Sequence, residues 1–103
     1  MSKKKVRSNF RESCLKRDSY QCRKCGAKNC KLDVHHITPR KALPAGGYVL
    51  ANGITLCDIP NGCHYKAELY YSAGQCPAGF EPSALYDLIG SSLAIATQAA
   101  SEA

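Results

Sequence analysis

Apolar residues recur at regular intervals in several segments, and the first of these predicts a helix from Asn9 to Arg17. Its apolar side chains fall near one face, and its basic side chains point outward. Asn9 is the expected N-cap, and Glu12 stands three residues later, where the acid of a capping box belongs. Asp18 and Ser19 are expected to end the helix. The apolar face comprises Phe10, Cys14 and Leu15, and the basic face comprises Arg11, Lys16 and Arg17.

The middle of the chain predicts two short strands and a helix. Residues 32–37 and 54–57 are rich in apolar and β-branched residues, which favours strands. The connection at 38–53 contains prolines and glycines and shows no clear secondary structure. A loop of this length in a small domain is usually functional. After a Pro-Asn-Gly turn, a helix is expected to begin near Cys63 and to end by Gly74.

A third helix is predicted to start at Glu81 and Pro82, because proline suits the first helical position. Phe80 and Leu85 are spaced to form a hydrophobic staple. The helical periodicity continues through Leu85, Leu88, Ile89, Leu93 and Ala96. We interpret this helix as a packing element.

These elements predict an α+β fold in which a strand–loop–strand–helix core is flanked by an N-terminal and a C-terminal helix. One domain is expected at residues 9–98, between a disordered basic arm at 1–8 and a disordered tail at 99–103. At 103 residues the chain is small enough that a structural metal would help its core. It shows neither a long apolar span nor a secretory leader, so we expect a cytoplasmic protein without membrane contact.

The net charge of +6 conceals a strong asymmetry between the two parts of the chain. Residues 1–41 hold thirteen Lys and Arg against three acids, whereas residues 42–103 hold one Lys against five acids. A concentration of positive charge of this kind favours a polyanionic partner. The alternative is a soluble basic protein with a disordered head. The polyanion interpretation is favoured because the basic residues continue through the first cysteine pair.

Cysteine spacing indicates a metal site. Seven cysteines without a secretory leader argue against a disulfide framework, and Cys22-x-x-Cys25 has the spacing of a zinc knuckle. Cys57 and Cys63 supply a second, wider pair, so the four thiolates form a candidate tetrahedral site for structural zinc. Sets that use Cys30, or His64 in place of Cys63, remain alternatives. The other cysteines, Cys14, Cys30 and Cys76, are expected to be buried thiols.

Residues 22–66 resemble the HNH endonucleases of the ββα-metal class, in their zinc-stabilised four-Cys form. The motifs that carry the resemblance are Cys22-x-x-Cys25, Leu-x-Val-His35-His36-Ile-x-Pro, Asn52-Gly-Ile-Thr-Leu-Cys57 and Cys63-His64. The run Lys16-Arg-Asp-x-Tyr-x-Cys22 and the helix at 80–92 extend it. The resemblance implies a small, treble-clef-like zinc core and a metal-dependent nuclease. The wide gap between Cys57 and Cys63 is its one departure.

The resemblance implies a role for each histidine. His36 aligns with the general base, and His35 and His64 align with the ligands of a catalytic Mg²⁺ or Mn²⁺ ion, with other divalent first-row ions as alternatives. Phosphodiester hydrolysis requires a base for water and a cation for the developing charge, which agrees with these roles. Asn52 is expected to tie the long loop to the segment of His36 and to orient its ring. An ordinary Asn-Gly turn is the alternative.

Neighbouring residues of a regular strand point to opposite faces, which bears directly on His35 and His36. If both serve one site, the strand is expected to end or distort there, so that both rings flank the bound phosphate. A regular strand with the rings on opposite faces would contradict the expected mechanism.

The expected partner is double-stranded DNA. We interpret Arg23, Lys24, Lys28 and Lys31 as contacts to its backbone, and Arg40 as a contact to the scissile or a neighbouring phosphate or as a solvated side chain. One active site cuts one strand, so a monomer or weak dimer would nick DNA with low sequence specificity. A phage packaging or restriction component is a candidate partner protein. The competing hypotheses are a non-catalytic zinc module that binds nucleic acid and a protein-interaction domain.

Overall fold

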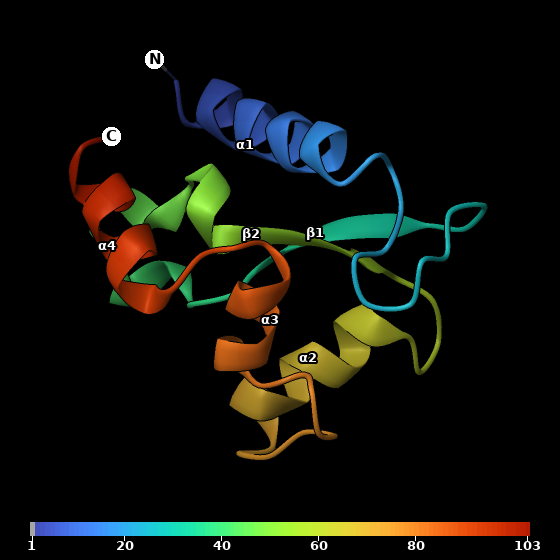
Figure 1. The fold of residues 1–103 in the computed structure, drawn as a ribbon. Helices are drawn as coiled ribbons and strands as arrows, with labels where there is room; N and C mark the ends of the chain where they lie inside the picture. The colour runs from blue at the N-terminus through green and yellow to red at the C-terminus, as the bar shows by residue number, and fades with distance from the viewer. Residues whose placement is uncertain (1) are drawn as a thin grey trace.

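The computed structural model describes residues 2–103, which form a two-stranded antiparallel sheet and four α-helices. Figure 1 shows the hairpin at the centre, with the helices arranged around it. The connection between the strands contains three short 3-10 helices. The elements are α1 (Lys3–Arg17), β1 (Leu32–His36), η1 (Arg40–Ala42), η2 (Pro44–Gly47), η3 (Leu50–Asn52), β2 (Gly53–Cys57), α2 (Cys63–Ser72), α3 (Pro82–Leu88) and α4 (Leu93–Ser101). The α+β class predicted from the sequence is confirmed.

The hairpin lies between two helices, α1 on one side and α2 on the other (Figure 1). Its register pairs Leu32 with Cys57 and His36 with Gly53. A Cβ atom at Gly53 would lie 2.5 Å from the Cys14 sulfur and 2.7 Å from the Phe10 ring, so α1 approaches the backbone of β2 too closely for any larger residue. On the other side, residues of α2 reach His35. The two strands thus present different residues to the two helices.

The first helix begins at Lys3, six residues before the start expected at Asn9. Ser2 is its N-cap, and the Ser2 hydroxyl accepts a hydrogen bond from the Lys5 N–H at 3.2 Å. The expectation of a disordered arm at residues 1–8 is therefore wrong for residues 3–8, because serine caps as well as asparagine and lysine is a good helix former. Met1 lies outside the described residues. The expected apolar face is confirmed, since Phe10, Cys14 and Leu15 are buried.

The predicted C-terminal helix is two helices, α3 and α4. Gly90 adopts a left-handed conformation (φ 65°) directly after α3, which glycine tolerates and which ends a helix. Ser92 then caps α4, and its hydroxyl accepts a hydrogen bond from the Ile95 N–H at 3.1 Å. α4 runs to Ser101, so the expectation of a disordered tail at 99–103 is wrong for most of that segment.

A buried carboxylate joins the end of α1 to β2. Asp18 accepts two hydrogen bonds of 2.8 Å from Arg17 and one of 3.0 Å from the Thr55 N–H. Burial alone would raise the pKa of Asp18, but these hydrogen bonds outweigh it and lower that pKa. Arg17, which was expected to point outward, is therefore a structural residue. It also donates to the carbonyl groups of Leu50 and Gly53.

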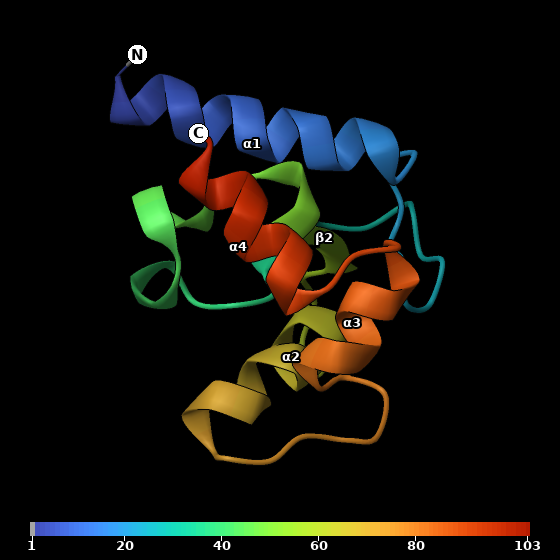
Figure 2. The same ribbon diagram turned by 60° about the vertical axis from the view of Figure 1, so that its left-hand side comes forward.

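The main core is formed by the hairpin and the helices that follow it, and its fully buried residues include Ile37, Ile54, Leu56 and Leu85. α4 packs against η2 and η3, and its C-terminal end comes close to the first turns of α1 (Figure 2). Across residues 2–103, no helix combines the length and the apolar character that a membrane crossing requires.

Candidate metal centres and the site between them

The four predicted zinc ligands converge on one point. Cys22 and Cys25 come from the turn after α1, Cys57 ends β2 and Cys63 begins α2. Their sulfur atoms all lie within 4.8 Å of one another. A tetrahedral zinc ion with Zn–S bonds of about 2.3 Å needs sulfur atoms roughly 3.8 Å apart. The Cys25 and Cys57 sulfur atoms are 3.8 Å apart, so this donor set fits zinc.

The turn between the first two cysteines has the geometry that a knuckle requires. Gly26 has a φ of 80°, as expected for the glycine after the second cysteine. The backbone N–H of Cys25 points back at the Cys22 sulfur, 3.5 Å away. On the opposite side, the backbone N–H of Cys63 points at the Cys57 sulfur, 3.3 Å away. N–H groups aimed at sulfur stabilise the thiolate form, which is the form that binds metal.

Electrostatics within the cluster favours a bound cation. Burial would raise the pKa of the Cys22 thiol, but backbone N–H donors lower it to about 7. The pKa of Cys63 is raised, first by burial and then by its neighbour Cys22. Close thiolates repel one another, so they cannot all ionise without a compensating cation. A divalent ion removes that obstacle.

The alternative zinc sets are not assembled in residues 2–103. Cys30 does not join the four-Cys cluster, and His64 joins a different group. Cys14 is a buried thiol, as expected, and burial raises its pKa to about 11. Cys30 and Cys76 are only partly buried, so the expectation of buried thiols is met at one of the three positions.

A second cluster lies on the α2 side of the hairpin and contains His35, His64 and Glu68. One carboxylate oxygen of Glu68 lies 3.2 Å from Nδ1 of His35 and 3.1 Å from Nε2 of His64. His35 is buried, whereas Glu68 is about half exposed. The hydrogen bond with His35 is the main cause that lowers the pKa of Glu68. Two imidazoles and a carboxylate are thus aimed at one point.

The other nitrogen of the His64 ring faces two carboxylates. Its Nδ1 lies 3.4 Å from Asp58 and 3.9 Å from Asp33. A histidine that binds a metal through one nitrogen commonly donates the other N–H to a carboxylate, which fixes the tautomer and the ring orientation. Asp58 is placed to accept a hydrogen bond from Nδ1 of His64, which leaves Nε2 as the metal-binding nitrogen. Asp33, Asp58 and His64 form another group whose donor atoms lie close together.

His36 leaves the strand on the opposite side from His35. Its ring packs against Phe10 at 4.7 Å and against Tyr48 at 4.8 Å between ring centres. β1 ends at His36 but keeps a regular register up to that residue. Of the two outcomes expected from the sequence, an end or a distortion of the strand, the structure shows the end without a distortion, and the two rings lie on opposite sides of β1. The His36 ring is held on the α1 side of the hairpin by its contact with Phe10 of α1.

The two rings nevertheless border one hollow. A pocket of about 410 Å³ opens at the end of β1, and His35 and His36 both line it. The residues that share this pocket include His64, Glu68, Arg40 and Tyr71. The strand end, rather than a strand face, is what brings the two histidines to a common space. We call this hollow the central pocket.

His36 is held in its neutral form. Burial is the main cause that lowers its pKa to about 4, and the positive charge of Arg40 adds to the effect. Its Nε2 is buried and has no hydrogen-bond partner within residues 2–103. At neutral pH the ring therefore carries a free lone pair.

Asn52 is fully buried and ties the long connection to the segment after His36. Its side-chain oxygen accepts from the Thr38 N–H at 3.0 Å and from the Tyr86 hydroxyl at 2.7 Å. Its amide donates to the carbonyl groups of Thr38 at 3.1 Å and Gly47 at 3.2 Å. These contacts agree with the expected tie and exclude a simple exposed turn. They reach the backbone beside His36 and not its ring.

Of the predicted DNA contacts, Arg40 alone lies at the central pocket. Arg23 donates to the carbonyl group of Leu88 and lies 3.4 Å from Asp18, which makes it a structural residue. Lys31 lies 3.4 Å from Asp58. Lys24 lies above the Phe80 ring, 5.1 Å from its centre, and Lys28 is exposed. The structure does not gather these basic residues at one site.

Glu68 was not among the residues predicted from the sequence. The available signal was its spacing from His64, because residues four apart on a helix lie on the same face. A carboxylate one turn after a candidate metal-binding histidine is a candidate third ligand.

Comparison with known proteins adds no family. A scan against protein-family models finds no match, and searches of curated proteins and of solved structures find none.

Proposed function

We propose that this protein is a metal-dependent DNA endonuclease that resembles the HNH class. The observation that carries the proposal is the set of His35, His64 and Glu68 at a pocket that His36 also borders. A second set of donors of a different kind, the four cysteines, lies apart from it and suits a structural ion. A thiolate site for the fold and an N/O site at a pocket are what such an enzyme requires.

His35, His64 and Glu68 would hold the catalytic ion. Imidazole and carboxylate donors suit Mg²⁺, Mn²⁺ or another divalent first-row ion, and three protein ligands leave the remaining positions to water and phosphate oxygens. When bound, such an ion offsets the charge that develops on the phosphate and the leaving oxygen. Asp58 holds the ring of His64 in the orientation that this role needs.

His36 would act as the general base. Because its Nε2 is sealed in the interior, Nδ1 is the nitrogen left to accept the proton of the attacking water. The rings of His35 and His36 lie on opposite sides of β1, against the expectation for this mechanism, so the proposal depends on the pocket at the strand end that both rings line. There the base has to reach only the water on the far side of the phosphate. A pKa of about 4 keeps the ring neutral, and the approach of an anionic phosphate favours its protonated form.

Arg40 is placed to contact the phosphate from the rim of the central pocket. The result of hydrolysis would be a nick, because one site acts on one strand. The resemblance to the HNH class implies a 5′-phosphate and a 3′-hydroxyl as its ends. We propose a monomer or weak dimer with low sequence specificity, since contacts to phosphate carry no sequence information.

A non-catalytic zinc module that binds nucleic acid is the alternative function. The observation that favours it is the packing of His36 between two aromatic rings, on the side away from His35. A histidine in such a place can be a purely structural residue.

Supercoiled plasmid separates the two functions. Zinc-loaded wild type and His36→Ala are incubated with the plasmid and Mg²⁺ or Mn²⁺. The enzyme hypothesis predicts relaxation by the wild type only, with equal DNA binding in the two proteins. The melting temperature of His36→Ala is expected to be somewhat lower, because the ring that packs against Phe10 and Tyr48 is lost, but the variant is expected to remain folded at the assay temperature. Inactivity of the wild type with both ions, with DNA binding intact, would support the non-catalytic module.

A further inference from the structure

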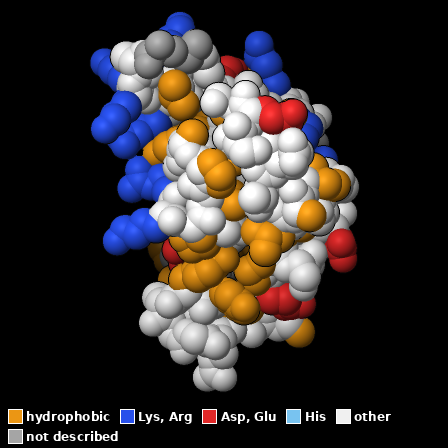
Figure 3. All heavy atoms as spheres, turned by 90° about the vertical axis from the view of Figure 1, so that its left-hand side faces the viewer, with side chains coloured by type: hydrophobic (Ala, Val, Ile, Leu, Met, Phe, Trp, Pro, Cys, Tyr) orange, Lys and Arg blue, Asp and Glu red, His pale blue; other side chains and the backbone are white. Residues whose placement is uncertain are grey.

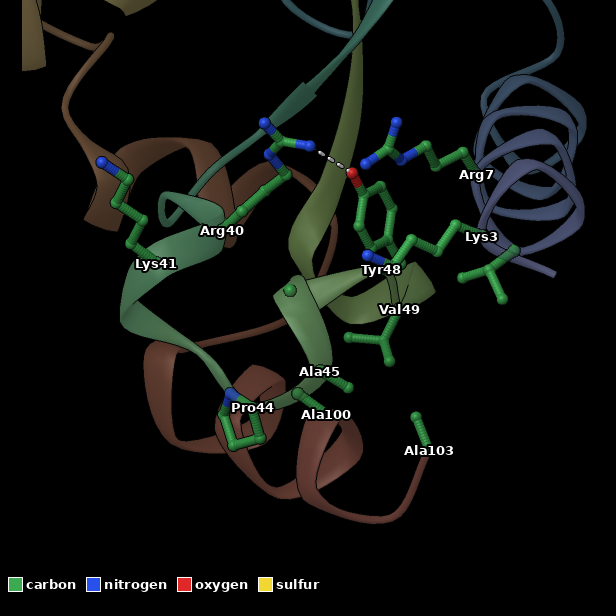
Figure 4. A pocket seen from close by; sticks show the side chains of 12 residues that line it. Lys3, Arg7, Arg40, Lys41, Pro44, Ala45, Tyr48, Val49, Ala100 and Ala103 are labelled. Carbon is green, nitrogen blue, oxygen red and sulfur yellow. Dashed lines mark hydrogen bonds between the residues drawn. The ribbon is translucent and has the colours of Figure 1, made fainter. Parts of the chain in front are cut away.

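A second pocket, lined by four cationic side chains, has no part in the proposed function. This pocket has a volume of about 550 Å³ and lies between α1, the 40–49 segment and α4. Figure 4 shows its lining side chains, and Figure 3 shows Lys and Arg side chains along the edge of the face on which it opens. We call it the basic pocket. Its cationic residues are Lys3, Arg7, Arg40 and Lys41.

Two guanidinium groups converge inside the basic pocket. Arg40 donates to the Tyr48 hydroxyl at 2.7 Å, and the Arg7 guanidinium lies 5.7 Å from the centre of the Tyr48 ring. Figure 4 shows them on either side of the hydroxyl. Burial would raise the pKa of Tyr48, but the hydrogen bond and charge of Arg40, together with the charge of Arg7, lower it. The pocket therefore favours an anion.

No acidic side chain lines the basic pocket within residues 2–103. Most of its wall is apolar, with Pro44, Ala45, Val49 and Ala100 among the lining residues. Binding of phosphate groups alone would require the positive charges but not the apolar recess. A recess of a few hundred Å³ with charges at its rim suits a compact ligand that combines an anionic group with a flat, less polar ring.

The basic pocket adjoins the central pocket, because Arg40 lines both. Tyr48 of the basic pocket also contacts His36 of the central pocket, with 4.8 Å between the ring centres. A ligand strand with one phosphate in the central pocket would therefore bring its next nucleotide to the basic pocket.

We propose that the basic pocket binds one unpaired nucleotide of the nucleic-acid strand, next to the phosphate held in the central pocket. Lys3 and Arg7 hold the phosphate of that nucleotide, and its base enters the apolar recess. A base in a duplex is stacked and paired, so it reaches such a recess only when it is unpaired. Single strands, flaps and mismatched duplexes are then the preferred substrates. This inference rests on the proposed nuclease function.

The test measures binding without cleavage. Zinc-loaded protein, with no added Mg²⁺ or Mn²⁺, is titrated into a fluorescent 12-nucleotide single strand and into its duplex, and anisotropy gives the affinities. Burial of one base on a protein surface predicts single-strand binding roughly tenfold tighter than duplex binding. Equal affinity for the two would overturn the inference.

Two matched charge variants locate the contact. Lys3→Gln with Arg7→Gln removes two cations from the basic pocket, and Lys4→Gln with Lys5→Gln removes two from the same helix outside it. Two lost phosphate contacts predict a loss of roughly 25-fold in single-strand affinity at 0.1 M salt, with the salt slope reduced by about 1.4. The control pair is expected to lose less than about threefold. Equal losses would overturn the inference.

Ala103→Leu tests the recess itself, because Ala103 is exposed and lines the pocket, and a leucine fills the recess without offering a ring on which a base could stack. It is expected to weaken single-strand binding roughly fivefold or more and to leave duplex binding unchanged. Cleavage is measured separately. Selective single-strand binding without any cleavage would contradict the nuclease function but not the binding of an unpaired nucleotide in the basic pocket. If the protein cleaves DNA, and neither the Lys3/Arg7 variant nor the Ala103 variant changes its single-strand affinity, this inference alone is overturned.

Discussion

Asn52→Ala tests the tie that holds the long connection in place. The change removes a side chain that is fully buried and that makes hydrogen bonds to Thr38, Gly47 and Tyr86. The Thr38 N–H and the carbonyl groups of Thr38 and Gly47 lose a partner inside the protein. The Tyr86 hydroxyl keeps its contact with the Thr38 hydroxyl at 2.6 Å.

The size of the effect follows from these contacts. A buried backbone group without a partner costs about 1–3 kcal/mol. Three such groups, each near the low end of this range, and a small cavity together predict a loss of about 3–5 kcal/mol in the free energy of unfolding. Domains of this size are stable by about 5–15 kcal/mol, so the variant stays folded but is markedly weakened. The melting temperature is expected to fall by about 15–30 °C.

Thermal and denaturant unfolding of the zinc-loaded proteins measure this loss. Asn29→Ala is the matched control, because Asn29 is exposed, and it is expected to stay within about 0.5 kcal/mol of the wild type. A loss below about 1 kcal/mol for Asn52→Ala would refute the reasoning, since the network would then contribute no more than one ordinary hydrogen bond.

Three further predictions concern the ions and the buried carboxylate. Cys25→Ser is expected to lose bound zinc and to unfold, because the metal site contributes directly to folding; zinc analysis and a melting curve check this. His64→Ala is expected to weaken Mn²⁺ binding at least tenfold while zinc content stays unchanged, as a titration would show. The pKa of Asp18 is lowered in the folded protein, so its contribution to stability is present above the unfolded pKa of about 4 and is lost as the pH falls below it. Asp18→Asn is therefore expected to give a flatter dependence of stability on pH in this range.

The local rules predicted the strands, the knuckle and α2 well because each is set by neighbouring residues. Gly26 takes the left-handed turn that a glycine after a cysteine pair suggests, and the four cysteines meet as their pairing implies. The helix boundaries were predicted less well, since Ser2 and Ser92 are caps whose use depends on the residues that follow. Propensity alone did not choose between Asn9 and Ser2 as the first cap.

The histidines of the candidate site were predicted, but Glu68 and the geometry of the site were not. The sequence indicated His35, His36 and His64, but the face of the hairpin that each ring takes depends on the packing of α1 through Phe10. The partners of Arg17 and Arg23 could not be predicted either, because both contact Asp18 and backbone carbonyl groups of segments distant in sequence. Tertiary contacts of this kind leave no periodic signal in the chain.

Plasmid nicking as a function of Mn²⁺ concentration tests the central claim most directly. The wild type is expected to nick with a rate that saturates as Mn²⁺ rises, and Glu68→Gln is expected to need at least tenfold more Mn²⁺ with the same zinc content. His36→Ala is expected to bind Mn²⁺ as the wild type does and to nick at no concentration. Nicking that is equal in all three proteins, or absent from the wild type at every Mn²⁺ concentration, would contradict the account.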